Sequence, residues 1–302
     1  MAYPADSTTR QSIKANAAVI TSRENRWLRR FRAALAGEHG DDGIVGVEGV
    51  RLVEAALGST QPVEALLVSD SGARHLPRVA RLLPNVPHVL RTSDKLFLSV
   101  ADTKTPQGIA ALVRPRLASI ENIMAGTSLL VVLVGVQDPG NVGTIIRAAE
   151  AFGASGAATC SADGIGTANP FGSKALRASA GSALRLPIVN GISPTILLAQ
   201  LRMIRAKIYA AVAITDGPNH ENSERESCPW NIDWKGPAAI LIGNEGAGLP
   251  ADLVRAADAR VYIPQAAAAV TVGIESLNAA MAASVLLYEA MRQRNTFRER
   301  HS

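Results

Sequence analysis

The sequence predicts an α/β protein with two domains. Its 302 residues exceed the length of one average domain, and 47% hydrophobic against 19% charged residues is typical of a globular chain. Short runs rich in β-branched residues alternate with segments of helical periodicity, which is the pattern of a mostly parallel sheet covered by helices. Ligands bind such a sheet at the carboxyl ends of its strands.

The first part of the chain predicts a small α/β domain over residues 22–117, preceded by a flexible polar tail at residues 1–21. Apolar residues recur at helical spacing over residues 25–36, which predicts a helix that ends before Gly37. The elements expected next are a strand at 44–47, a helix at 50–57, a strand at 63–68, a helix at 76–83, a strand at 86–90, a helix capped by Ser93 that runs through Leu98, and a strand at 109–113.

The second part, residues 118–302, predicts a parallel-sheet domain that opens on the apolar run from Ser128 to Gly135. A strand of this composition suits a position buried on both faces of a sheet. The elements expected next are a helix at 142–152, a strand at 157–160, a helix at 173–180, a strand at 186–189, a helix from Ser193-Pro194 to about 205, strands at 208–214, 238–243 and 260–263, a short helix near Asp252, and a long helix at 275–294.

Cysteine content and hydropathy narrow the class of protein. Cys160 and Cys228 are too few for a disulfide framework or a zinc site. The longest apolar run is far short of the roughly 18 residues that a membrane span needs. The first ten residues are polar and lack the apolar segment of a signal peptide. We therefore expect a cytoplasmic protein with no metal and no membrane contact.

The net charge of +5 is concentrated in the first domain, because residues 1–117 contain 16 Lys and Arg against 11 Asp and Glu. The densest basic patch lies in the first predicted helix and consists of Arg26, Arg29, Arg30 and Arg32. Such a patch attracts the phosphate backbone of a nucleic acid. A solvated helix face produces the same pattern, so charge alone does not decide between the two interpretations.

Two segments that follow predicted strands carry polar side chains suited to chemistry. In the first, Asn141 stands at the turn into a helix, where it suits the N-cap. Arg147 lies between one and two turns further on, beside Val142 and Ile146, and offers a planar cation to a phosphate or a carboxylate. In the second, three glycines within six residues permit close backbone approach to a ligand, and Glu245 between them needs a partner that glycines do not provide.

A third segment, from Ile263 to Asn278, precedes an Ala-rich helix. Glu275 or Ser276 suits the N-cap of that helix, whereas Asn278 inside its first turn has a weaker structural reason, because Asn has a low preference for helix interiors. Polar groups that follow three separate strands and converge at one edge of the sheet indicate a binding site at that edge.

These three segments resemble the three motifs of the SpoU (TrmH) family of RNA ribose 2′-O-methyltransferases, which belongs to the SPOUT superfamily. The matching stretches are Asn141-Val-Gly-Thr-Ile-Ile-Arg-Ala-Ala-Glu-Ala-Phe-Gly153, Ile242-Gly-Asn-Glu-Gly-Ala-Gly248 and Glu275-Ser-Leu-Asn278. Residues 22–113 resemble the family's N-terminal substrate-binding domain, chiefly through residues 47–54 and 105–108. The resemblance implies S-adenosylmethionine as cofactor, a trefoil knot in the C-terminal domain, and a homodimer formed through that domain. It also implies an RNA partner, ribosomal RNA before transfer RNA, that docks on the basic patch.

The resemblance further implies a role for the residues of the three segments. Cofactor-binding residues are expected to be Gly243, Asn244, Ile263 and Leu277, largely through backbone groups. Residues on the catalytic side are expected to be Asn141, Arg147, Glu245, Ser276 and Asn278. A ribose 2′ oxygen attacks the sulfonium methyl in this chemistry. Because a guanidinium stays protonated, we expect Arg147 to stabilise the developing alkoxide and Glu245 to orient Arg147 or the hydroxyl.

One stretch departs from the family pattern beside the expected cofactor pocket. The loop at residues 265–274 is several residues longer than usual, with Gln265 where Met is common. Two alternatives to ribosomal RNA methylation remain: a transfer RNA ribose methyltransferase, and a non-catalytic RNA-binding protein of the same fold. A nucleotide-dependent oxidoreductase would need a glycine fingerprint after its first strand, which the sequence lacks.

Overall fold

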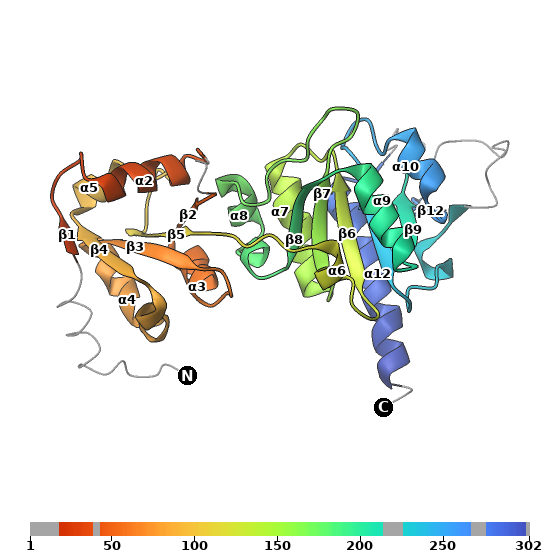
Figure 1. Cartoon of the computed structure of the whole chain (residues 1–302), viewed down its shortest axis with the longest axis horizontal. Helices are drawn as coiled ribbons and strands as arrows, with labels where there is room; N and C mark the ends of the chain where they lie inside the picture. The colour runs from red at the N-terminus through yellow and green to blue at the C-terminus, as the bar shows by residue number, and fades with distance from the viewer. Residues whose placement is uncertain (1–17, 39–42, 214–225, 267–275, 300–302) are drawn as a thin grey trace. The chain divides into compact units, whose positions relative to one another are not determined.

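The computed structural model describes residues 18–38, 43–213, 226–266 and 276–299. Two compact units divide the chain, one of residues 1–116 with 171–185 and one of residues 117–170 with 186–302. Each unit contains one sheet (Figure 1). Residues 1–17 of the expected tail lie outside the described residues. Residues 18–20, at the end of the predicted tail, form a strand with Ile20 buried.

Unit 1 is built on a mixed five-stranded sheet in the order β1-β4-β3-β5-β2. β1, β4 and β3 are parallel, and β5 pairs antiparallel with both β3 and β2. Its strands are β1 (Ala18–Ile20), β2 (Val45–Glu48), β3 (Val63–Ser69), β4 (His88–Thr92) and β5 (Ile109–Val113). Its helices are α2 (Arg26–Leu35), α3 (Val50–Leu57), α4 (Leu76–Val79), α5 (Asp94–Leu98) and α8 (Ser173–Ala178).

Helix α2 begins where the sequence predicts, because the Asn25 side chain accepts a hydrogen bond from the backbone N–H of Trp27. Its apolar stripe, which includes the fully buried Leu28 and Phe31, packs on the sheet. Gly46 of β2 allows this close approach: a Cβ there would lie 2.7 Å from the backbone nitrogen of Leu35. The face of α2 that carries the arginines is therefore turned away from the core.

Two expectations for the chain around unit 1 need correction. The helix expected at 76–83 ends at Val79, and a 3₁₀ segment follows over Ala80–Asn85 that contains Pro84. Proline has no N–H to donate to a continuing α-helix. Residues 171–185, expected in the second domain, group with unit 1, where α8 packs beside β2. The functional domain limits at residues 21 and 117 stay a prediction.

Unit 2 contains a seven-stranded sheet in the order β10-β12-β9-β11-β6-β7-β8. Every pair is parallel, which confirms the parallel sheet predicted from the sequence. Its strands are β6 (Leu129–Val134), β7 (Gly156–Cys160), β8 (Ile188–Ile192), β9 (Lys207–Ala211), β10 (Glu226–Ser227), β11 (Ala238–Ile242) and β12 (Ala259–Val261). Its helices are α6 (Ile120–Ile123), α7 (Pro139–Ala151), α9 (Pro194–Met203), α10 (Ala251–Ala256) and α12 (Ala279–Glu299). The trefoil knot stays a prediction.

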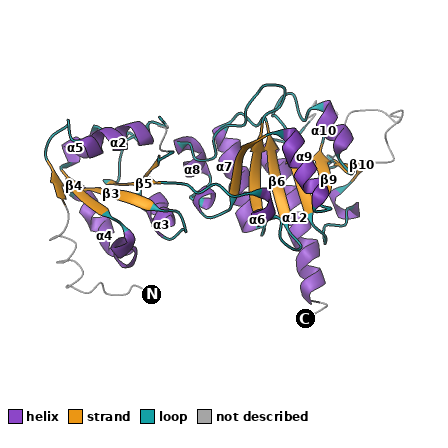
Figure 2. Ribbon diagram, viewed as in Figure 1, coloured by secondary structure: helices purple, strands orange, loops and turns teal. Residues whose placement is uncertain are grey.

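Helices cover both faces of this sheet (Figure 2). Apolar residues of α6, α9 and α10 form one core cluster with alternate residues of β6. α7 and α12 pack against each other away from that cluster. All six residues of β6 are fully buried, as expected of a central strand in a two-sided parallel sheet. No described helix is both long enough and apolar enough to cross a bilayer.

The order of the strands brings the predicted loops together. β6 and β11 are direct neighbours, with Leu133 opposite Ile242, and both run in the same direction. The loops that follow them therefore leave the sheet side by side at its carboxyl edge. β9 separates β11 from β12, so the segment after β12 leaves the same edge two strands away.

Candidate functional site

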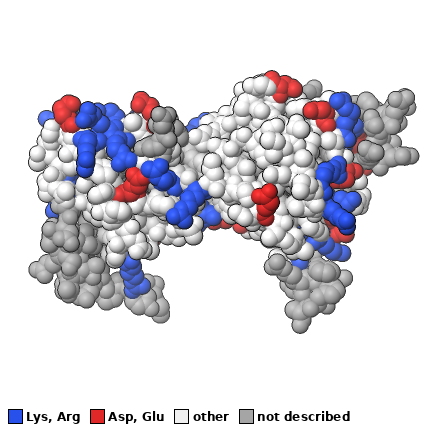
Figure 3. Space-filling view, in the orientation of Figure 1, with Lys and Arg blue, Asp and Glu red and all other residues white. Residues whose placement is uncertain are grey.

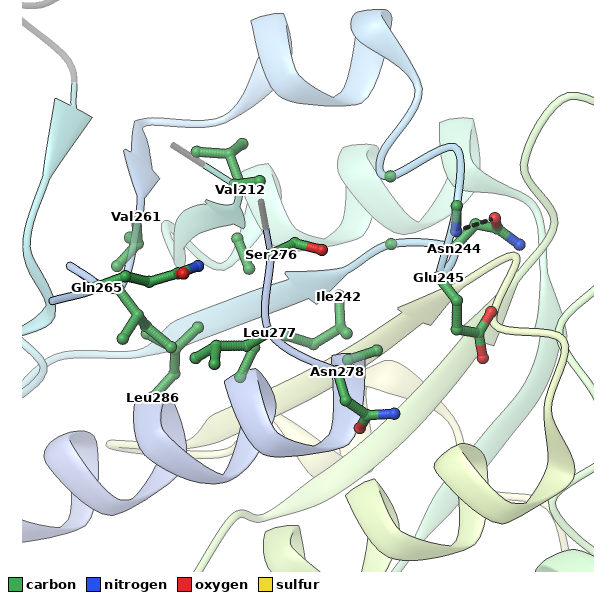
Figure 4. Close-up of a pocket in the computed structure, with 18 residues that line it drawn as sticks. Val212, Ile242, Asn244, Glu245, Val261, Gln265, Ser276, Leu277, Asn278 and Leu286 are labelled. Carbon is green, nitrogen blue, oxygen red and sulfur yellow. Dashed lines mark hydrogen bonds between the residues drawn. The ribbon is translucent and has the colours of Figure 1, made fainter. Parts of the chain in front are cut away.

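A cavity of about 260 Å³ lies at the carboxyl edge of the unit 2 sheet (Figure 4). Its walls come from the ends of β9, β11 and β12, from the loop after β11 and from the start of α12. The sequence-predicted residues that line it are Gly243, Asn244, Glu245, Ile263, Ser276, Leu277 and Asn278. Asn141 and Arg147 are not among the lining residues, and Glu275 lies outside the described residues.

The loop after β11 is a tight turn held by its own backbone and by one asparagine. A Cβ at Gly243 would lie 2.4 Å from the carbonyl carbon of Gly248, so only glycine permits this approach. The Asn244 side-chain oxygen accepts hydrogen bonds from the N–H groups of Gly246 and Ala247, each at 2.9 Å. Its amide nitrogen donates to the carbonyl of Gly135 at 2.8 Å. The Asn244 side chain thus fixes the loop against the end of β6. The backbone of the loop is held at the wall of the cavity by these contacts.

Glu245 joins the loop after β11 to the loop after β6. Its carboxylate accepts hydrogen bonds from the backbone N–H groups of Gln137 and Asp138, each at 3.2 Å, and from the side-chain amide of Asn141 at 2.9 Å. Burial alone would raise the pKa of Glu245, but these hydrogen bonds outweigh burial and hold the pKa below its usual value. The carboxylate is therefore ionised at neutral pH and is a weak base.

Asn141 and Asn278 continue this hydrogen-bond chain to helix α12. The side-chain amide of Asn278 donates to the side-chain oxygen of Asn141 at 3.0 Å. The side-chain oxygen of Asn278 accepts from the N–H groups of Ala280 and Met281. An ionised carboxylate at one end only accepts and helix N–H groups at the other end only donate, so the orientation of both amides is fixed. The chain Glu245–Asn141–Asn278 is called the polar relay below.

The caps of the two helices differ from the sequence predictions. Asp138, not Asn141, caps α7, and its carboxylate accepts from the N–H of Gly140. Asn278, not Ser276, has the capping contacts at the start of α12, which begins at Ala279, and Glu275 lies outside the described residues. Asp138 and Asn278 are ordinary capping residues. Because Asp138 takes the cap of α7, the Asn141 side chain is available to Glu245.

Arg147 lies on the exposed face of α7, whereas Val142 and Ile146 are fully buried. It makes no hydrogen bond or ion pair with any residue that the structure describes, and the hydrogen bonds of Glu245 go to the loop after β6 instead. Contact between Glu245 and Arg147, one of the two orientations expected, is therefore not formed within the described residues. α7 and α12 lie side by side in the same direction, as the Asn141–Asn278 hydrogen bond and the ring contact of Phe152 with Tyr288 show.

In unit 1, the predicted basic patch lies on α2 (Figure 3). Arg26, Arg29 and Arg32 are exposed, whereas Arg30 is partly buried and forms an ion pair with Glu64 at 2.9 Å. The patch includes an aromatic residue that the sequence reasoning passed over. The guanidinium groups of Arg26 and Arg30 lie 5.7 and 5.1 Å from the ring centre of Trp27. The position of Trp27 among the four arginines in the sequence is the feature that indicates an aromatic ring in this patch.

Replacing Glu245 with Gln tests the charge at the centre of the relay. Because the folded-state pKa of Glu245 is depressed, its contribution to stability is complete above the ordinary value of 4.5 and is lost as pH falls through the folded-state pKa. We expect Glu245→Gln to lower the thermal midpoint at pH 7 and the difference to close as pH falls through the folded-state pKa of Glu245. Glu121→Gln, which removes an exposed carboxylate from α6, should leave the midpoint unchanged at pH 7. A difference that persists undiminished at low pH would contradict the assignment.

Comparison with known proteins identifies relatives of both parts of the chain. Residues 128–288 match the SpoU rRNA Methylase family, and residues 41–111 match the MRM3-like substrate binding domain. The 23S rRNA (guanosine(2553)-2′-O)-methyltransferase RlmP of Bacillus subtilis is 34% identical over 80% of this chain and 86% of its own length. The 23S rRNA (uridine(2479)-2′-O)-methyltransferase of Streptomyces viridochromogenes is 33% identical over 91% of this chain and 92% of its own.

A solved structure of an rRNA methyltransferase has the same fold as this chain. The crystal structure of the AdoMet-bound rRNA methyltransferase from Sinorhizobium meliloti superposes with a TM-score of 0.75 at 29% identity, and the match covers 91% of this chain and 98% of that one. The family match spans more than half of the chain and contains all three of the predicted motif segments. The protein therefore belongs to the SpoU rRNA methylase family.

Proposed function

We propose that this protein methylates a ribose 2′-hydroxyl in ribosomal RNA and uses S-adenosylmethionine as the methyl donor. The observation that carries the proposal is the polar relay, which three separate loops assemble beside a cavity in a chain of the SpoU family. The relatives named above methylate 23S rRNA according to their names, and the Sinorhizobium meliloti structure contains the cofactor. We also propose a cytoplasmic location, because the bacterial relatives named above act on ribosomal RNA according to their names.

The residues around the cavity fit the cofactor. Gly243 lets the backbone of Gly248 approach closely, which brings the backbone of this turn to the cavity wall, and Ile263 and Leu277 add apolar surface. The side-chain oxygen of Gln265 is buried at this cavity without a hydrogen-bond partner, so the site has an acceptor to offer. We assign Gly243, Asn244, Ile263 and Leu277 to cofactor binding, with Asn244 acting through its backbone. When bound, S-adenosylmethionine supplies an electrophilic methyl group on its sulfonium.

The relay residues hold the acceptor side of this site in place. Glu245, as a weak base, fixes the backbone of residues 137 and 138 and the side chain of Asn141. Asn141 and Asn278 then keep one geometry relative to the start of α12, and Ser276 lies beside them with its side chain exposed. Positioning of this kind converts a bimolecular reaction into one between held groups. We assign these four residues to orienting the ribose.

Arg147 supplies a positive charge that stabilises the negative charge developing on the ribose 2′ oxygen as its proton passes to water. A guanidinium stays protonated and presents paired donors, so it stabilises an oxyanion and the neighbouring RNA phosphate together. Its exposed place on α7, outside the cavity of its own subunit, is explained if a second subunit packs there.

A homodimer formed through α7 and α12 meets this requirement. Met281, Val285 and Tyr288 lie at intervals of four and three residues on α12 and are 60%, 42% and 51% exposed. Large apolar side chains in such a row are typical of a protein interface. The contacts at both ends of the helix pair show that α7 and α12 run side by side, which supports an interface that includes the exposed Arg147 of α7. The interface would therefore bring Arg147 to the site that the two subunits share.

The basic patch on α2 is the surface that we assign to RNA. Arg26, Arg29 and Arg32 are exposed to a phosphate backbone, and Arg30 packs with Arg26 against the ring of Trp27. Arginines beside an aromatic ring are typical of surfaces that bind single-stranded nucleic acid. Transfer RNA remains the alternative substrate, and mapping of 2′-O-methylated nucleotides in cells with and without the gene distinguishes the two RNA classes.

Replacing Arg147 with Ala should reduce methyl transfer by at least about 100-fold, because it removes a stabiliser of the oxyanion. Binding of S-adenosylhomocysteine, measured by calorimetry, should stay unchanged, since Arg147 does not line the cavity. Arg255→Ala, which removes an exposed arginine from α10, serves as control and should leave both quantities unchanged. Undiminished turnover of Arg147→Ala would refute the assignment, and lack of turnover in the intact protein would favour the non-catalytic alternative.

Replacing Val285 with Arg should convert the dimer to a monomer, because it places a charge in the centre of the apolar row. Sedimentation velocity measures the change directly. The matched control is Ile196→Arg, which places the same charge at a 54% exposed apolar position on α9 and should leave the dimer intact. A monomeric wild-type protein at micromolar concentration would be incompatible with the proposed interface.

Replacing Arg29 with Ala should weaken RNA binding at every sequence tested. The slope of the logarithm of the binding constant against the logarithm of the salt concentration should fall by the value for one phosphate contact, which is about 0.9 on duplex and about 0.7 on single strands. Arg78→Ala removes the same charge from α4 of the same unit, where Arg78 forms an ion pair with Glu54, and should leave the slope unchanged. Equal slopes for wild-type protein and Arg29→Ala would exclude α2 from the RNA surface.

A further inference from the structure

A buried side-chain oxygen without a hydrogen-bond partner is rare in folded proteins. Within the described ranges of the chain, only Gln200 and Gln265 have one. Gln200 lies on α9 and does not line the cavity, whereas Gln265 is part of the cavity wall. An acceptor that is withdrawn from water and has no partner costs free energy, so the cavity acceptor of Gln265 calls for a donor from a ligand.

Gln265 stands at the apolar end of the cavity. Figure 4 shows its amide reaching into the cavity from the side of Val261 and Leu286, while Glu245 and Asn278 lie at the other end. Val261 and Leu286 are fully or almost fully buried, and Val212 adds a third apolar side chain. The cavity therefore has one end that suits a flat uncharged group and one end that carries the polar relay.

We propose that the Gln265 carboxamide recognises the adenine ring of the cofactor and accepts a hydrogen bond from its exocyclic amine. This inference rests on the proposed function, because it takes the cofactor as the ligand. A carboxamide carries an acceptor and a donor side by side, which complements the amine and a ring nitrogen of adenine. Gln265 is thereby a specificity-determining residue for the base of the cofactor.

The apolar walls decide between adenine and the amino-acid part of the cofactor. The amino-acid part carries an ammonium and a carboxylate, and burying either charge among Val212, Val261 and Leu286 is costly without a charged partner. Adenine is flat and uncharged, so its burial there does not carry the free-energy cost of burying a charge. Placing adenine at Gln265 also directs the remainder of the cofactor toward the end of the cavity that the relay occupies.

The inference is tested by calorimetric binding to the full-length protein of two probes. One is S-adenosylhomocysteine, and the other is its analogue with hydrogen in place of the 6-amino group. The wild-type protein should bind S-adenosylhomocysteine about tenfold more tightly than the analogue, the effect of leaving one buried acceptor unpaired. Gln265→Met should bind S-adenosylhomocysteine about tenfold more weakly than wild type and should not distinguish the two probes.

Two further variants separate recognition from a change in pocket shape. Gln265→Glu keeps an acceptor and should keep the preference for the amine, whereas Gln200→Met removes the other unpartnered amide and should bind both probes as wild type does. Equal affinity of wild type and Gln265→Met for S-adenosylhomocysteine would overturn the inference. A variant Gln265→Met that weakens both probes to the same degree would also overturn it. Failure of the wild-type protein to bind either probe would instead refute the cofactor assignment itself.

Discussion

The ionised carboxylate of Glu245 is the contact on which the arrangement of the site depends. It accepts two backbone N–H groups from the loop after β6 and the amide of Asn141, so two loops separated by about a hundred residues in the chain share one geometry. Through Asn278 the same hydrogen-bond chain reaches the first turn of α12. An uncharged acceptor at this position would weaken all of these contacts, because hydrogen bonds to charged groups are the stronger class.

The fold supplies the rest of the geometry. A central pair of parallel strands, buried on both faces, delivers the two loops to one edge of the sheet. Helix α7 follows the loop after β6 and lies beside α12, which follows the segment after β12. As a result, the cavity has an apolar end around Val261 and Leu286 and a polar end around the relay. That division suits a cofactor with an uncharged base at one end and a reactive sulfonium toward the other.

Much of this arrangement was predictable from the sequence, and the failures are local. The β-branched run of β6, the parallel sheet and the convergence of three loops follow from patterns that persist over many residues. The capping residue of α7 does not follow from such a pattern, because Asp138 and Asn141 are equally suitable caps. The choice between them depends on the contact of Asn141 with Glu245, which is distant in sequence. The unpartnered acceptor of Gln265 is a property of its surroundings and has no sequence signal. The exposure of Arg147 depends on helix packing in the same way.

A crystal structure of the full-length protein with S-adenosylhomocysteine tests the central claim most directly. Our account predicts that the cofactor sulfur lies at the end of the cavity beside Glu245, Asn141 and Asn278, with the hydrogen bonds among these three side chains intact. The account would be contradicted by a cofactor bound elsewhere on the protein, by a sulfur at the Gln265 end, or by a relay that separates when the ligand binds.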